Sequence, residues 1–222
     1  EGHMNLLNWS NEKNLIFLII SFFTSFIFVN ILYVFLITPS SLELINIAQA
    51  NNEALPRTFS VLLKDIEQQI CLILFFWVLI IASVNYLKIN EEDELLESDL
   101  SDKSKLETLV ATKLESETFN TESLIENKID YQAIDMSLIK YMSWAVPSIG
   151  FIGTVRGIGM ALEKSGEAIA GDISGMTESL GLAFNSTFVA LFLSIFIMLI
   201  INLIEQRQDQ IIIKLRSKFL ES

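Results

Sequence analysis

Residues 147–159 read PSIGFIGTVRGIG, a glycine-rich apolar stretch that contains one threonine. On a helix, positions i, i+3, i+4 and i+7 lie on one face. Four residues have this spacing: Gly150, Gly153, Thr154 and Gly157. They form a face with almost no side-chain bulk and one hydroxyl. In a membrane, such a face suits close approach to another helix or to an ion path.

A second small-residue face lies further along the chain, in a long apolar stretch. Its members fall at i, i+4, i+7 and i+11: Ala183, Thr187, Ala190 and Ser194. Two such faces either pack closely together or line a narrow channel jointly. Pro147 removes one backbone donor from the first helix, so we expect a kink there and a freed carbonyl that can face a polar path.

The composition around these stretches indicates a membrane protein. The chain is 51% hydrophobic, its mean hydropathy is +0.48, and several apolar runs approach the ~20 residues that cross a bilayer. We therefore predict an all-α membrane protein with four transmembrane helices, a short acidic cytoplasmic helical segment and a C-terminal cytoplasmic helix extension. The predicted spans are residues 14–38, 70–88, 139–163 and 179–205.

The distribution of lysine and arginine predicts the topology, because basic residues favour the cytoplasmic side. Placing both termini in the cytoplasm puts eleven of the fifteen basic residues there. Ser40 and Glu43 match a capping box, which predicts a short surface helix after the first span. The remaining segments are a tag remnant and cytoplasmic N-terminus (1–13), periplasmic loops (39–69 and 164–178) and a cytoplasmic C-terminal helix (206–222).

Residues 89–138 form the acidic segment. Fourteen acidic residues stand against four lysines there, so this segment carries most of the chain's net charge of −12. Its leucines recur at helical spacing, which predicts amphipathic helices outside the bilayer. The acidic surface is either simply solvated or contacts a cytoplasmic effector. It would repel nucleic acid and anionic lipid headgroups, so we expect no nucleic-acid partner.

The region around the two threonines resembles the MotA/TolQ/ExbB proton channel family. In that family a Gly-Thr-Val-x-Gly segment follows a proline, and a threonine deep in the next helix faces it. Residues 153–157, Gly-Thr-Val-Arg-Gly, match the first motif, and residues 183–187, Ala-Phe-Asn-Ser-Thr, match the second. The resemblance covers about residues 140–205.

The resemblance implies that Thr154 and Thr187 line the path of a transported H+ or Na+, with no other cofactor. It implies a pentamer in the bilayer of the bacterial inner membrane, surrounding two copies of a single-span MotB/TolR/ExbD-like protein whose aspartate carries the ion. Ion flow would drive rotary mechanical work. No acidic residue lies in the middle of a predicted span, so a carboxylate from a partner is a chemical requirement. The other small residues would pack the pore helices: Pro147, Gly150, Gly153, Gly157, Ala183, Ala190 and Ser194.

Two positions depart from the family pattern. Leu182 stands where transporter-energising members often carry a glutamate, and the four spans look more like the flagellar-stator branch. Arg156 lies within the third span, where a charge is costly unless it is paired. It either pairs with Glu163 or Glu178, or forms a positive gate that repels cations.

Two other functions remain open from the sequence. One is a non-conducting oligomeric membrane scaffold, in which the glycine faces serve packing alone. The other is a small secondary transporter, which would need broken helices in the first two spans; those spans contain neither glycine nor proline. We do not expect an enzyme, because the sequence has no Ser/His/Asp set, metal cluster or phosphate loop.

Overall fold

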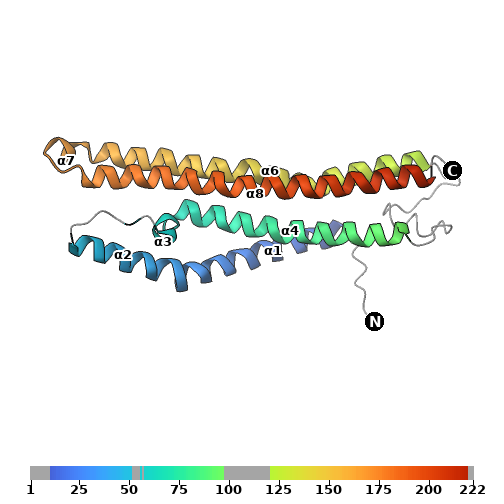
Figure 1. Ribbon diagram of the computed structural model, residues 1–222, viewed down its shortest axis with the longest axis horizontal. Coiled ribbons are helices and arrows are strands. Elements are labelled where there is room, and N and C mark those ends of the chain that lie inside the picture. The colour runs from blue at the N-terminus through green and yellow to red at the C-terminus, as the bar shows by residue number, and fades with distance from the viewer. Residues whose placement is uncertain (1–10, 52–55, 57, 98–120, 220–222) are drawn as a thin grey trace. The chain divides into compact units, whose positions relative to one another are not determined.

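The computed structural model describes residues 11–51, 56, 58–97 and 121–219, and these residues form helices and short connections without a strand. Four helices are long and apolar enough to cross a membrane, which confirms the predicted all-α membrane class. Figure 1 shows the elements in order: α1 (Asn11–Leu32), the π-helical turn η2 (Tyr33–Ile37), α2 (Thr38–Asn51), α3 (Phe59–Leu62), α4 (Ile66–Glu97), α6 (Thr121–Glu163), α7 (Ser165–Ile169) and α8 (Ser174–Phe219).

The helices that carry the threonines are much longer than their predicted spans. α6 has 43 residues and α8 has 46. At 1.5 Å per residue either helix is about twice as long as the ~30 Å hydrocarbon core is thick. α8 continues past Ile204 to Phe219, as the predicted C-terminal helix extension requires. The ends of the predicted acidic segment belong to α4 and α6, whereas its middle, residues 98–120, and the start of the predicted tag remnant lie outside the described residues.

The helical stretch that begins with α1 does not stop at residue 38, where the first predicted span ends, so the predicted loop at 39–69 is partly helical. The stretch passes through η2 and continues as α2 to Asn51. The Thr38 N–H donates to the Tyr33 carbonyl, five residues back. Pro39 has no N–H to donate and its ring needs room in the preceding turn, which the wider π-helical turn provides. Ser40 and Glu43 therefore lie inside a helix instead of starting one.

The predicted loop at 164–178 is also partly helical. It contains α7, and α8 already begins at Ser174. Between them Gly171 adopts a φ of 106°, a left-handed conformation that glycine reaches without the steric cost of a side chain. This glycine makes the tight turn that leads from α7 back into α8.

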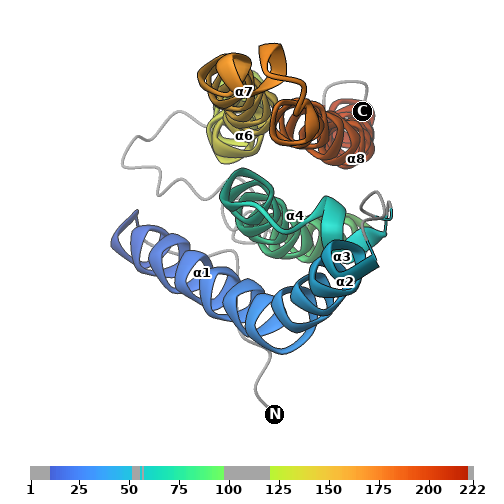
Figure 2. The same cartoon turned by 90° about the vertical axis from the view of Figure 1, so that its left-hand side faces the viewer.

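The helices contribute to two compact units. The threonine unit comprises Ser21–Val78 and Met142–Met198. Within it α4 lies between α1 and the pair formed by α6 and α8 (Figure 2). The Ser25 hydroxyl donates to the Ile73 carbonyl at 2.6 Å and so joins α1 to α4. The buried core beside this bond is apolar apart from one tyrosine: Val29, Tyr33, Ile37 and Ile73.

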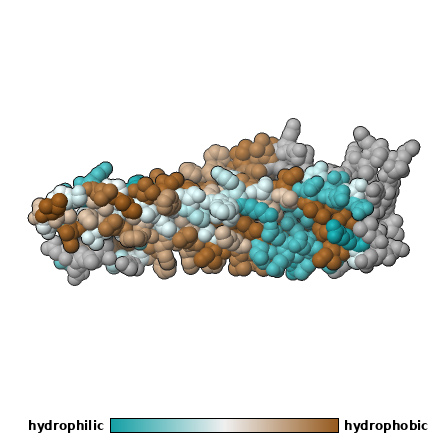
Figure 3. Space-filling view, turned by 90° about the horizontal axis from the view of Figure 1, so that it is seen from above, coloured by the Kyte–Doolittle hydropathy of each residue, from teal (hydrophilic) through white to brown (hydrophobic). Residues whose placement is uncertain are grey.

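The terminal unit comprises the described parts of Glu1–Ile20, Leu79–Tyr141 and Leu199–Ser222. Three ion pairs join α4, α6 and α8 in this unit, one between each two of these helices. They are Glu92 of α4 with Lys128 of α6, Asp93 of α4 with Lys214 of α8, and Lys140 of α6 with Glu205 of α8. In Figure 3, which views the side formed by α6 and α8, hydrophilic side chains gather toward the N-terminal half of α6 and the C-terminal half of α8.

Candidate functional site

The two small-residue faces predicted from the sequence lie against each other. A Cβ added to Gly150 would come within 2.3 Å of the Ala190 Cβ, and one added to Gly157 within 2.7 Å of the Ala183 Cβ and backbone nitrogen. Non-bonded carbon atoms normally stay about 3.5–4.0 Å apart. Only glycine therefore fits at these two positions of α6, and the backbones of α6 and α8 approach closely.

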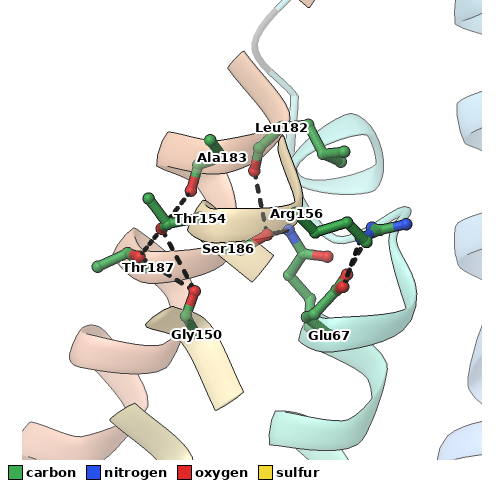
Figure 4. A network of polar contacts seen from close by, with 9 residues as sticks. Glu67, Gly150, Thr154, Arg156, Leu182, Ala183, Ser186 and Thr187 are labelled. Carbon is green, nitrogen blue, oxygen red and sulfur yellow. Dashed lines mark hydrogen bonds and ion pairs between the residues drawn. The ribbon is translucent and has the colours of Figure 1, made fainter. Parts of the chain in front are cut away.

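This close approach brings Thr154 and Thr187 together. Their Oγ1 atoms are hydrogen-bonded to each other, and either hydroxyl can be the donor. The Thr154 hydroxyl also lies 3.0 Å from the Ala183 carbonyl oxygen, and the Thr187 hydroxyl lies 3.1 Å from that of Gly150 (Figure 4). Both threonines are half-buried. The site is thus a pair of hydroxyls with one proton each and a choice of acceptors, set between two helices.

The other predicted packing residues occupy the same region. Pro147 lies inside α6, which continues as a helix on both sides of it. Ser194 is 5% exposed and donates to the Leu191 carbonyl of its own helix at 2.8 Å. A Cβ on Gly153 would come within 2.5 Å of the Ser186 Cβ and 3.1 Å of the Glu67 Cγ. Gly153 therefore faces two helices, α8 and α4.

Arg156 has a different partner from the two that the sequence suggested. Its guanidinium binds Glu67 of α4 through two contacts of 2.7 Å, Nε to Oε1 and Nη2 to Oε2. Glu163 is exposed at the end of α6, and Glu178 pairs with Lys64 at 3.5 Å. The helical spacing places Glu163 on a face of α6 similar to that of Arg156. The Glu67 carboxylate of α4 pairs with Arg156 instead, because Gly153 leaves room for the Glu67 side chain.

Sequence reasoning missed Glu67 because the predicted loop included it. α4 begins at Ile66, so Glu67 lies in the first turn of a spanning helix, with its side chain 7% exposed. Next to it, Gln68 is fully buried and donates from Nε2 to the Ser186 hydroxyl at 3.4 Å. An available signal was the polar sequence Glu67-Gln68-Gln69 directly before an apolar run, since acidic residues are enriched in the first turn of a helix.

Asp65, which immediately precedes α4, gives a prediction about stability. Burial raises the pKa of this carboxyl and outweighs the opposing effect of Lys64 and Arg156, and one carboxyl oxygen is buried without a hydrogen-bond partner. Asp65→Asn removes the buried charge and keeps a residue that caps helices well. We expect a gain of about 1 kcal/mol at neutral pH, seen as a melting temperature about 2–4 °C higher.

The pH dependence checks the cause of that gain. The unfolded chain ionises Asp65 at its ordinary pKa of 3.8 and the folded chain at a raised pKa, so the folded state binds more protons between these values. Stability therefore falls as pH rises through this window, and the advantage of Asp65→Asn should shrink at acidic pH. Asp172→Asn is the control: hydrogen bonds from Ser174 lower the pKa of this exposed carboxyl, so no gain is expected. A gain that does not change with pH would contradict the explanation.

Comparison with protein families gives a match over most of the second half of the chain. The family model described as the MotA/TolQ/ExbB proton channel family matches residues 88–217, which is more than half of the chain. The matched region includes α6, the part of α8 up to Ser217 and both threonines. Neither the curated proteins nor the solved structures contain a match.

Proposed function

Since the chain belongs to the MotA/TolQ/ExbB proton channel family, we propose that it is the pore-forming subunit of an ion-driven rotary motor in the bacterial inner membrane. The observation that carries this proposal is the hydroxyl pair of Thr154 and Thr187 between the two helices of the matched region. Five copies surround two copies of a single-span MotB/TolR/ExbD-like partner. The flow of H+ or Na+ between them is converted into mechanical work.

The chemistry of the hydroxyl pair suits a path for an ion that another chain carries. A hydroxyl both donates and accepts, so it can bridge a water wire or coordinate a dehydrated cation without holding it tightly. Glu67 is engaged by Arg156, which argues against a role as the moving carrier. An aspartate of the partner supplies that carrier, and each elementary charge that crosses releases about 2.3 kcal/mol per 100 mV.

The orientation rests on the basic residues. With both termini in the cytoplasm, the ion pairs of Glu92 with Lys128 and of Asp93 with Lys214 lie on the inner side of the membrane, where lysine and arginine are favoured. The connection from α7 to α8 then lies on the periplasmic side. This orientation puts the acidic segment, residues 89–138, within reach of a cytoplasmic effector.

Ion flux into vesicles tests the proposal. The protein is purified together with the single-span protein encoded beside it and reconstituted with a trapped pH-sensitive dye or, separately, a Na+-sensitive dye, and a K+ diffusion potential is imposed. We expect Thr154→Ala and Thr187→Ala each to lower flux by about tenfold, the equivalent of one hydrogen bond of about 1.4 kcal/mol in the rate-limiting step. Thr177→Ala is the matched control, because this threonine of α8 is exposed and donates to the nearby Ile173 carbonyl.

One observation favours a second candidate function, the non-conducting scaffold. Both threonine hydroxyls bond within this chain, and the glycine faces pack α6 on α8 inside one subunit. Flux no higher than that of protein-free vesicles, in the unaltered complex as well as in both threonine variants, would favour the scaffold. Purification of the chain without any single-span partner would reject the motor.

A further inference from the structure

The first turn of α4 contacts both helices that carry the threonines. Glu67 binds Arg156 of α6 through two 2.7 Å contacts, and Arg156 follows Thr154 by two residues. The Glu67 carboxylate is nearly inaccessible, with 7% of its side chain exposed. A bidentate pair of this kind fixes orientation as well as distance, because the planar guanidinium matches the planar carboxylate. Glu67 thereby fixes α4 against α6.

The neighbouring residue makes the corresponding contact with α8. Gln68 is fully buried and donates to the hydroxyl of Ser186, which directly precedes Thr187. Ser186 is itself 1% exposed and donates to the Leu182 carbonyl at 3.0 Å. A buried polar side chain has few alternative partners, so its existing hydrogen bond is costly to lose. Gln68 thereby fixes α4 against α8.

Gly153 is where the three helices meet. Its absent side chain admits Ser186 of α8 and Glu67 of α4 at once, and it immediately precedes Thr154. Figure 4 shows the hydroxyl pair on one side of the contact between α6 and α8, and the ion pair of Glu67 and Arg156 on the other. Glu67 and Gln68 therefore contact residues that lie one or two positions from the threonines, Arg156 and Ser186.

We propose that the first turn of α4 sets the spacing of the hydroxyl pair, and that Glu67 and Gln68 are positioning residues for Thr154 and Thr187. The relevance of this spacing to ion movement rests on the proposed function, whereas the spacing itself can be measured independently. A shift of α4 would open or close the contact between the two threonines. Under the proposed function, α4 thus belongs to the ion-conducting machinery.

Disulfide formation measures the spacing directly. Thr154→Cys and Thr187→Cys are combined with Cys71→Ala, which removes the single native cysteine, and the full-length protein is oxidised in membranes. Two side chains whose oxygens are in contact should give sulfurs that cross-link readily. Adding Glu67→Gln or Gln68→Met should slow cross-linking by about fivefold or more, because a disulfide needs Cβ atoms about 3.5–4.5 Å apart.

The control and the rescue separate positioning from general damage. Glu178→Gln breaks the ion pair with Lys64, which joins the turn before α4 to α8. The Glu178 side chain is 55% exposed, whereas that of Glu67 is 7% exposed and that of its partner Arg156 is 43% exposed. Exposed pairs contribute little, so cross-linking should remain at its original rate. The swapped pair, Glu67→Arg with Arg156→Glu, should restore cross-linking. It also serves if Glu67→Gln alone fails to accumulate.

Each outcome decides the proposal. Unchanged cross-linking in both Glu67→Gln and Gln68→Met, or equal slowing by Glu178→Gln, would overturn it. Ion flux is also measured, both for the threonine variants and for Glu67→Gln with native threonines. These fluxes distinguish failure of the positioning role from failure of the proposed function. If the threonine variants conduct normally while Glu67→Gln slows cross-linking, the positioning stands and the role of the two threonines in the ion path fails. If the threonine variants lose flux while Glu67→Gln changes neither flux nor cross-linking, only the positioning role fails.

Discussion

Replacing Lys128 by methionine is expected to destabilise the protein by about 3–5 kcal/mol, because it leaves the buried Glu92 carboxylate without its ion-pair partner. The two side chains are 10% and 8% exposed, and they join α6 to α4 in the terminal unit. Methionine keeps the length and the apolar stem of lysine, so packing changes little. Thermal unfolding in detergent should show a melting temperature lower by about 10 °C or more.

A double variant and an exposed pair serve as controls for Lys128. Glu92→Leu combined with Lys128→Met removes both charges, and a buried ion pair replaced by apolar side chains is often neutral or more stable. Lys214→Met breaks the pair with Asp93, whose partners are 46% and 31% exposed, so about 1 kcal/mol or less is expected. If Lys128→Met and Lys214→Met lower the free energy of unfolding equally, the ion pair of Glu92 with Lys128 is not desolvated.

The second large effect is expected from Gly157→Ala. The added methyl would come within 2.7 Å of the backbone nitrogen and 2.8 Å of the Cα of Ala183. The backbone of Ala183 cannot change rotamer to avoid the new methyl group as a flexible side chain could, so α6 and α8 must separate. Overpacking of this kind costs about 1–3 kcal/mol, and we expect the upper end, together with lost cross-linking between cysteines at positions 154 and 187.

Gly159 provides the matched control for Gly157. It lies two residues further along α6, and a Cβ there would meet nothing within 4 Å. Alanine is favoured over glycine in a helix by about 1 kcal/mol, so Gly159→Ala should raise the melting temperature slightly. The same gain in propensity applies to Gly157→Ala, so the difference between the two variants measures the clash. Similar stabilities for both would mean that α6 and α8 are not in close contact.

The contact between α6 and α8 could be predicted from the sequence because it depends on glycine and alanine, which have little or no side chain. Gly150, Gly157, Ala183 and Ala190 recur at helical spacing, and a face without bulk has few uses other than close approach. The same pattern placed Thr154 and Thr187 on these two faces. Local spacing within each helix was sufficient, since both helices follow the regular period.

The partner of Arg156 could not be predicted in this way. Glu67 lies 89 residues away in the sequence, and periodicity identifies the face of a helix without identifying the neighbour that covers it. The continuation through Pro39 was missed for a related reason. Proline normally ends a helix. The residues around Pro39 carry no sequence pattern that predicts the π-helical turn which accommodates this proline. Tertiary packing and local backbone geometry decided both features.

The hydrogen bond between Thr154 and Thr187 has a consequence for the polarity of ion transport. Either hydroxyl can donate to the other, and each has a backbone carbonyl to which it can donate instead. Rotating two O–H bonds therefore reverses the dipole of the pair without moving a heavy atom. Because its dipole reverses at so little cost, the hydroxyl pair does not by itself favour one direction of ion flow. Under the proposed function, the direction of work is imposed by the electrochemical gradient and by the partner, and a reversed gradient should drive current backwards through the same two threonines.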